Sequence, residues 1–190
     1  MLSYDQDYWD NYYGGSYEET FAVAFPLQMI LTSLWPRSFD EPPDSFADVG
    51  CGPGQTLQAA ENLLPDALVY GVECQRIPEE RVVHSGVLFG DFMEISKQLT
   101  PVDLLYVSCS MYIPWEQQRS FLTECARLSK KAIVFANLYL EDGLDIPFDG
   151  LRTTIYKDRQ GFRTIMQNYF SMSFAGTNNV DFFTRKDITH

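Results

Sequence analysis

Asp48-Val49-Gly50-Cys51-Gly52-Pro53-Gly54 is the most informative segment of this chain. It follows a short apolar run, Phe46 to Gly50, and precedes a segment with helical character, Thr56 to Leu64. Glycines at alternate positions allow a tight turn and let a ligand approach the backbone without a Cβ in the way. The unpaired N–H groups of the following helix point to the same place. The segment therefore predicts a strand, a ligand-binding turn and a helix.

An acidic residue, Glu73, ends the next predicted strand, Ala67 to Glu73. An acid about twenty residues after such a turn is the usual partner of ribose hydroxyls in nucleotide-binding α/β folds. A glycine turn alone is a weak signal, but strand, turn, helix and acid in this order are much more specific. Together they predict a site for a cofactor that contains a ribose.

Short apolar runs and helical segments alternate through the middle of the chain. This alternation predicts right-handed crossovers and a parallel sheet, in which the apolar strand Asp103 to Cys109 is buried on both faces. Further strands are expected at Val87 to Gly90 and Ala132 to Ala136, and helices at Pro78 to Val83, Phe92 to Leu99 and Pro114 to Leu128.

The alternation of apolar strands and helical segments ends after Asn137. Arg152 to Lys157 and Phe162 to Phe170 flank Asp158-Arg159-Gln160-Gly161, which is typical of a hairpin turn. Val180 to Arg185 is the last strand candidate. We therefore expect antiparallel terminal strands, with no amphipathic helix between them and the fifth strand.

The N-terminal part is rich in aromatic residues. Tyr4, Tyr8 and Tyr12 are four apart and would share one face of a helix, which Gly14-Gly15 ends. A second helix begins at Ser16. The aromatic helix is either a lid over the cofactor or a fixed helix packed on the body. We expect one domain with three parts: a helical cap or lid at 1–44, a cofactor-binding core at 45–137 and antiparallel strands at 138–190.

The composition fits a globular protein of a reducing compartment. The chain has 190 residues, of which 45% are hydrophobic, and its net charge is −12. This charge disfavours nucleic acids and membrane surfaces as partners. No apolar run approaches the roughly 20 residues of a transmembrane helix, and the acidic N-terminus is unlike a secretory signal. Four cysteines without a Cys-x-x-Cys pair, and two histidines, predict no metal site and a cytoplasmic protein.

The segment from Asp48 to Gly54, with Glu73, resembles the cofactor motifs of class I S-adenosylmethionine-dependent methyltransferases. The resemblance covers roughly residues 46–137. It implies a doubly wound, Rossmann-like, mostly parallel seven-stranded sheet with an antiparallel C-terminal hairpin and N-terminal helices. It also implies that Glu73 binds the ribose hydroxyls, Asp91 the adenine amino group and Phe92 the adenine ring.

Ten residues are expected to bind the cofactor: Asp48, Gly50, Cys51, Gly52, Gly54, Glu73, Cys74, Asp91, Phe92 and Ser108. Tyr12, Tyr112 and Trp115 are candidates for the acceptor site. No catalytic residue is assigned. Several of these residues have simpler interpretations. Asp91 could only cap a helix, loop amides could hold Asp48, and His84 is expected to be a surface loop residue.

The implied activity is methyl transfer to a small molecule, the favoured acceptor, or to a protein side chain. Such a transfer mainly requires alignment of the acceptor and exclusion of water. Two alternatives remain. One is a methyltransferase-like binding or accessory protein without turnover. The other is an NAD(P)-dependent oxidoreductase, but its Gly-x-Gly-x-x-Gly pattern needs a glycine where this chain has Gln55.

Overall fold

The structure is a computed structural model that describes residues 26–108, 113, 115–136, 159–175 and 180–186. Its strands are β1 (Ser45–Val49), β2 (Leu68–Glu73), β3 (Val87–Phe89), β4 (Val102–Val107), β5 (Ser129–Ala136), β6 (Phe170–Ala175) and β7 (Val180–Arg185). Its α-helices are α3 (Gln55–Leu63), α4 (Phe92–Ile95), α5 (Trp115–Leu128) and α6 (Arg159–Met166). Shorter helical turns are η1 (Ile30–Leu34), η2 (Trp35–Arg37), η3 (Glu79–Arg81) and η4 (Ser96–Gln98).

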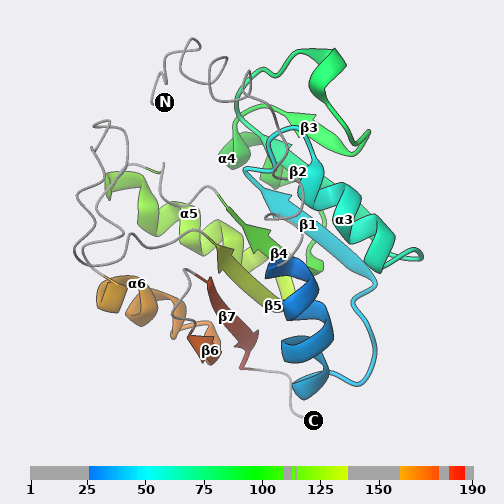
Figure 1. Ribbon diagram of the computed structural model, residues 1–190. Helices are drawn as coiled ribbons and strands as arrows, with labels where there is room; N and C mark the ends of the chain where they lie inside the picture. Colours follow the sequence, from blue (N-terminus) through cyan, green and yellow to red (C-terminus); the bar gives the residue numbers. More distant parts are fainter. Residues whose placement is uncertain (1–25, 109–112, 114, 137–158, 176–179, 187–190) are drawn as a thin grey trace, which may run out of the picture.

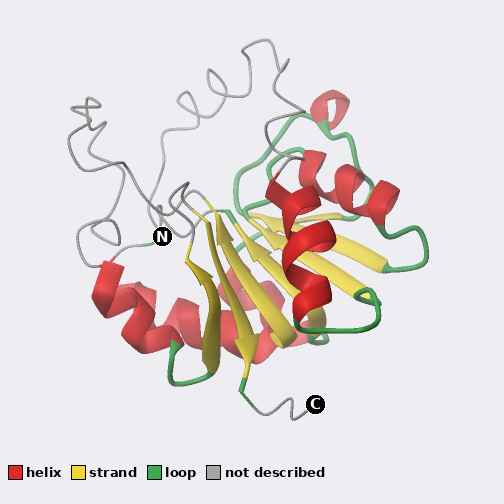
Figure 2. Cartoon of the chain, turned by 60° about the horizontal axis from the view of Figure 1, so that its bottom comes forward, coloured by secondary structure: helices red, strands yellow, loops and turns green. Residues whose placement is uncertain are grey.

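The strands form one seven-stranded sheet in the order β3-β2-β1-β4-β5-β7-β6, with helices on both faces (Figures 1 and 2). The five strands from β3 to β5 are parallel, whereas β7 is antiparallel to both β5 and β6. This confirms the predicted doubly wound sheet with an antiparallel C-terminal pair. All five strands predicted for the parallel part are present.

Alternate residues of the central strands face two separate hydrophobic cores. In β4, Leu105 and Val107 pack with α5 and α6, whereas Leu104 and Tyr106 pack with α3 and the η1–η2 segment. Every residue of β4 is buried, as expected for a strand covered on both faces. The two cores explain why β4 is apolar from Leu104 to Val107 rather than alternating between apolar and polar residues.

The helical segment of residues 26–37 covers one face of the sheet together with α3 (Figure 2). Leu27, Ile30 and Trp35 are almost fully buried there. The Trp35 indole N–H donates to the carbonyl of Glu41 at 2.8 Å, so its polar atom is satisfied as the segment ends. Residues 1–25, including the predicted aromatic helix and the start of the second helix at Ser16, lie outside the described residues.

The expected hairpin turn at residues 158–161 is wrong, because the chain forms α6 there. Phe162 and Met166 lie one helical turn apart and are 4% and 0% exposed, packed in the core with Phe135 and Phe183. Burying two such side chains contributes roughly 1.5–3 kcal/mol each, more than the ~1 kcal/mol by which a helical glycine such as Gly161 disfavours a helix. The expectation of no amphipathic helix before the terminal strands is therefore also wrong.

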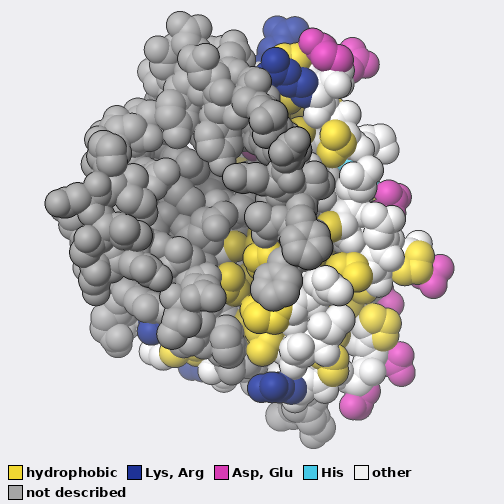
Figure 3. Space-filling model, viewed as in Figure 1, with side chains coloured by type: hydrophobic (Ala, Val, Ile, Leu, Met, Phe, Trp, Pro, Cys, Tyr) yellow, Lys and Arg dark blue, Asp and Glu magenta, His cyan; other side chains and the backbone are white. Residues whose placement is uncertain are grey.

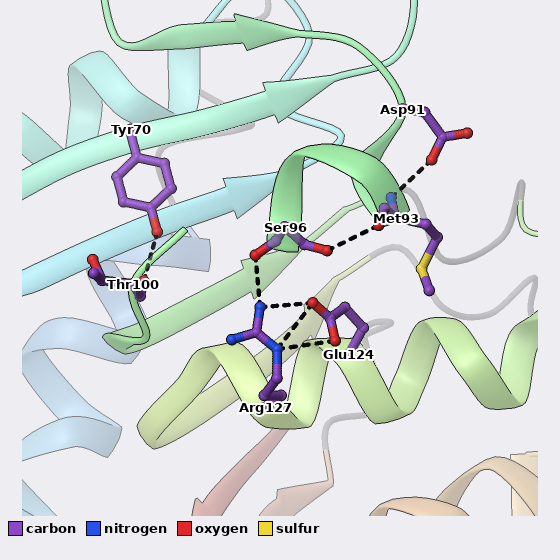
Figure 4. Close-up of polar contacts among 7 residues, drawn as sticks. All are labelled: Tyr70, Asp91, Met93, Ser96, Thr100, Glu124 and Arg127. Carbon is purple, nitrogen blue, oxygen red and sulfur yellow. Dashed lines mark hydrogen bonds and ion pairs between the residues drawn. The ribbon is translucent and has the colours of Figure 1, made fainter. Parts of the chain in front are cut away.

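Polar contacts join the helices on the α5 side of the sheet (Figure 4). The Arg127 guanidinium donates to the carbonyl of Ser96 at 2.6 Å and forms an ion pair with Glu124 at 2.7 Å. The Tyr70 hydroxyl donates to the carbonyl of Thr100 at 3.1 Å. These bonds attach η4 and the following loop to α5 and β2. Among the described residues, no helix is both long and apolar enough to cross a membrane.

Candidate cofactor site

The glycine turn, Gly50 to Gly54, connects β1 to α3 at the rim where the parallel strands end. Gly50, Gly52 and Gly54 have φ angles of 84°, 54° and 97°, all in the left-handed region. Residues with a Cβ adopt this region at a cost, so the turn needs glycine at these positions. The Gly50 N–H donates to the carbonyl of Val72 at 2.8 Å, and Gly54 caps α3. The turn is thus fixed between β2 and the first turn of α3.

Glu73 is the last residue of β2 and is 4% exposed. Its carboxylate accepts hydrogen bonds from the backbone N–H of Gly52 at 2.9 Å and of Gln75 at 2.8 Å. Burial raises the pKa of Glu73, and the two backbone donors oppose this rise. Each carboxylate oxygen can accept a second hydrogen bond. Glu73 therefore anchors the glycine turn and keeps capacity for further donors such as hydroxyls.

Asp48 lies in β1 next to the turn and is fully buried. Its Oδ1 accepts a hydrogen bond from the Ser108 hydroxyl at 3.2 Å, while Oδ2 has no hydrogen-bond partner among the described residues. Burial raises the pKa of Asp48 to about 7, although the hydroxyls of Ser108 and Thr56 lower it. A buried carboxylate oxygen without a donor is costly. Asp48 therefore offers an acceptor for a cation or a proton beside the turn.

A hollow of about 360 Å³ lies next to Glu73, between the ends of β2 and β3. It is lined by Cys74, Gln75, Arg76, Ile77, Phe89 and Gly90. Phe89 is 46% exposed, which is unusual for an aromatic residue outside a binding surface. Burial raises the pKa of Cys74 to about 12, so it remains a neutral thiol. The hollow can accommodate a planar group bonded to a ribose at Glu73.

Asp91 and Phe92 follow β3 beside this hollow. The Asp91 carboxylate accepts from the Met93 N–H at 2.8 Å and so caps α4, while its other oxygen points away from the helix (Figure 4). Phe92 is 8% exposed and packs edge to face on Phe121, with ring centroids 5.2 Å apart. The capping interpretation of Asp91 is thus present in the structure. The adenine contacts of both residues stay predictions.

The remaining predicted residues include Cys51 and the three candidates for the acceptor site. Cys51 is buried beneath the turn, and burial raises the pKa of its thiol strongly. Trp115 is the first residue of α5, and Tyr12 and Tyr112 lie outside the described residues. No cluster of three or more His, Cys, Asp or Glu side chains that could hold a metal ion occurs in the described part of the chain.

His84 is not the surface residue that its loop position suggests. Its side chain is only 9% exposed, and its Cβ lies against Gly54 of the glycine turn. The contact joins residues far apart in the sequence, so no local pattern reveals it. The nearby Gly86, which leaves room for the imidazole, is the one signal that the sequence offered.

Acidic side chains are scattered over the surface near α3, and no continuous basic band crosses the described part of this face (Figure 3). A protein that follows a nucleic-acid backbone needs such a band.

No protein-family model matches the chain, and no curated protein sequence matches it. Many solved structures share its fold. A SAM-dependent methyltransferase from Archaeoglobus fulgidus is 15% identical with a TM-score of 0.61, over 93% of this chain and 98% of that one. Magnesium protoporphyrin IX methyltransferase from Synechocystis PCC 6803, solved with S-adenosylhomocysteine (SAH), is 17% identical with a TM-score of 0.55, over 95% and 94% of the two chains.

An O-methyltransferase family protein from Burkholderia thailandensis is 12% identical with a TM-score of 0.61, over 90% of this chain and 59% of that one. These likenesses extend over nearly the whole chain. The chain has the fold of class I S-adenosylmethionine-dependent methyltransferases.

Proposed function

We propose that this protein binds S-adenosylmethionine and transfers its methyl group to a small molecule or to a protein side chain. The observation that carries the proposal is the pair of buried carboxylates, Asp48 and Glu73, on either side of the glycine turn. Both lie at the rim where open α/β sheets bind their ligands. A methyltransferase fold of similar length that holds SAH supports the choice of cofactor.

The residues present fit this cofactor. Glu73 has acceptor capacity for ribose hydroxyls, and the hollow beside it suits an adenine base. The unpartnered Oδ2 of Asp48 suits the positively charged methionine part. When bound, the cofactor supplies a methyl group on a sulfonium, which is a good leaving group. The role of the chain is then to orient the acceptor and to exclude water.

The proposal does not assign the acceptor molecule or a general base. A base is needed only when the acceptor must lose a proton during the transfer. Glu141, Asp142 and Tyr112 are candidates by their position after strands, and all lie outside the described residues. Structures with this fold include enzymes named for magnesium protoporphyrin IX and for plantazolicin, which supports a small molecule as the favoured acceptor class.

The oxidoreductase alternative is less well supported. Dinucleotide-binding sheets of that class have the order 3-2-1-4-5-6 and are parallel. Here the antiparallel β7 lies between β5 and β6. An accessory protein that binds the cofactor without turnover is the stronger alternative. The free thiols of Cys51, Cys74 and Cys125 support our proposal of a cytoplasmic location.

A melting-temperature screen with S-adenosylmethionine, SAH, NAD and NADP tests the cofactor. At a hundredfold excess over the dissociation constant, the methionine-derived ligands should stabilise the fold by about 2.7 kcal/mol. A shift seen only with NAD or NADP would overturn the proposal. Incubation with S-adenosylmethionine and panels of small molecules and peptides, followed by mass spectrometry, then separates an enzyme from an accessory protein.

A further inference from the structure

The segment of residues 82–87 packs directly against the glycine turn. The Val83 N–H donates to the carbonyl of Pro53 at 2.9 Å. A Cβ placed on Gly54 would lie 2.8 Å from the Cβ of His84 and 3.0 Å from a methyl group of Val87. Gly54 is therefore a glycine for two reasons, its φ angle of 97° and the lack of space beside it. His84 occupies that space.

Both ring nitrogens of His84 have a partner. Nδ1 accepts a hydrogen bond from the Gly86 N–H at 3.0 Å, and Nε2 lies 3.5 Å from the Glu61 carboxylate on α3. An acceptor at Nδ1 requires the neutral tautomer whose proton is on Nε2, directed at Glu61. The carbonyl of Gly86 in turn accepts from the Gly71 N–H of β2 at 3.0 Å. His84 is thus connected to β2, to α3 and to the glycine turn.

We propose that His84 is a positioning residue for the cofactor: fixed by its hydrogen bond to Gly86, it holds the glycine turn in its binding conformation. This inference rests on the proposed function, because the turn needs positioning only if it binds a ligand. Glu73 holds the turn at the Gly52 N–H, and the His84 segment holds it at Pro53 and Gly54. A turn that is ordered before binding loses less conformational entropy when the ligand arrives.

Three variants of the full chain test the proposal by calorimetric titration with SAH. His84→Ala keeps the Cβ beside Gly54 but removes the imidazole, and with it the acceptor for the Gly86 N–H. We expect about tenfold weaker binding, the equivalent of one well-placed hydrogen bond. His84→Asn keeps an oxygen near the position of Nδ1 for the Gly86 N–H, and binding should return to within about threefold of the unmodified protein. Ser85→Ala, an exposed neighbour, is the matched control and should bind as the unmodified protein does.

The outcomes are distinct from those of the proposed function. An unmodified protein that does not bind SAH contradicts the proposed function itself. If the unmodified protein binds SAH and His84→Ala binds equally well, even with a lower melting temperature, His84 is only structural and the inference is overturned. Asparagine no better than alanine overturns it too. If His84→Ala does not fold, His84→Gln, which keeps the bulk but misplaces the acceptor, takes its place.

Discussion

The two edges of the parallel sheet at which its strands begin and end differ in the hydrogen-bond partners of their buried aspartates. At the rim where strands begin, Asp103 is 5% exposed, accepts from the Asp44 N–H at 3.1 Å and pairs with Lys131 at 2.7 Å. At the rim where strands end, Asp48 on the neighbouring strand is fully buried, and its Oδ2 has no donor among the described residues. The carboxylate of Asp103 thus has its hydrogen-bond partners, whereas the carboxylate of Asp48 has one oxygen without a donor.

This difference separates stability from binding. A buried carboxylate with its donors costs little, whereas one without them destabilises the folded state by an amount that a ligand can recover. The polar groups at the rim where strands begin therefore stabilise the fold, whereas the rim where strands end has an unsatisfied acceptor that a ligand can use. Glu73 combines both roles, because its two backbone donors leave further acceptor capacity.

The largest expected effect is the pH dependence caused by Asp48. Its pKa is about 7 in the folded chain against 3.8 for the ordinary group. The folded state thus binds the proton of Asp48 more tightly than the unfolded state does. Protonated Asp48 therefore contributes fully to the free energy of unfolding below pH 4, and this contribution is lost as the pH rises to 7. The loss is on the order of 4 kcal/mol. Urea unfolding without ligand, measured from pH 4 to 8, should show it.

Asp48→Asn should flatten most of this pH profile, although the raised pKa of Glu73 leaves a smaller slope of the same sign. Asp66→Asn, at an exposed position, is the control and should follow the unmodified protein. If Asp48→Asn keeps the full slope, Asp48 is not the unsatisfied group that distinguishes the two rims.

An intermediate effect is expected at Glu73. Glu73→Gln preserves the size of the side chain but removes the charge that strengthens its hydrogen bonds. A hydrogen bond to a charged group is worth roughly 1.5–3 kcal/mol, so SAH affinity should fall about ten- to a hundredfold. Calorimetry measures this, with the exposed Glu79→Gln as the matched control. Unchanged affinity would remove Glu73 from the site and leave it only the role of anchoring the turn.

The smallest effect is expected at the beginning rim. Lys131 is 33% exposed, so Lys131→Met should destabilise the fold by about 1 kcal/mol or less, because Asp103 keeps the Asp44 N–H. Thermal unfolding compared with Lys130→Met, at the exposed neighbouring position, measures the difference, which high salt should reduce. A loss of several kcal/mol would show that Asp103 depends on its cation far more than this comparison implies.

The parallel half of the fold could be predicted because its signals are local. The glycine turn, the acid at Glu73 and the apolar run of β4 each lie within a few residues and have one physical interpretation. α6 could not be predicted in this way, because the burial of Phe162 depends on Phe135 and Phe183, which are distant in the sequence. There the turn-like local signal was misleading.

The same limit applies to the candidate site. Asp48 and Ser108 were both predicted from the motifs, but only the structure shows that they share a hydrogen bond and that one oxygen of Asp48 remains without a donor. The contact between His84 and Gly54 joins the glycine turn to the segment before β3, where Gly86 is the only local sign of it. Which polar groups have hydrogen-bond partners, and which side chains pack together, depends on strands and loops that meet only in the folded sheet.

The position of β7 has a consequence for synthesis of the protein. β7 is translated after β5 and β6, yet it lies between them, and it supplies Phe182 and Phe183 to the two opposite cores. A nascent chain on the ribosome that stops before Val180 has all the other strands but an incomplete sheet, with β5 and β6 presenting unpaired edges. Such edges invite association with other chains. The sheet is therefore completed only after β7 has been translated, and until then the facing edges of β5 and β6 are open to other chains.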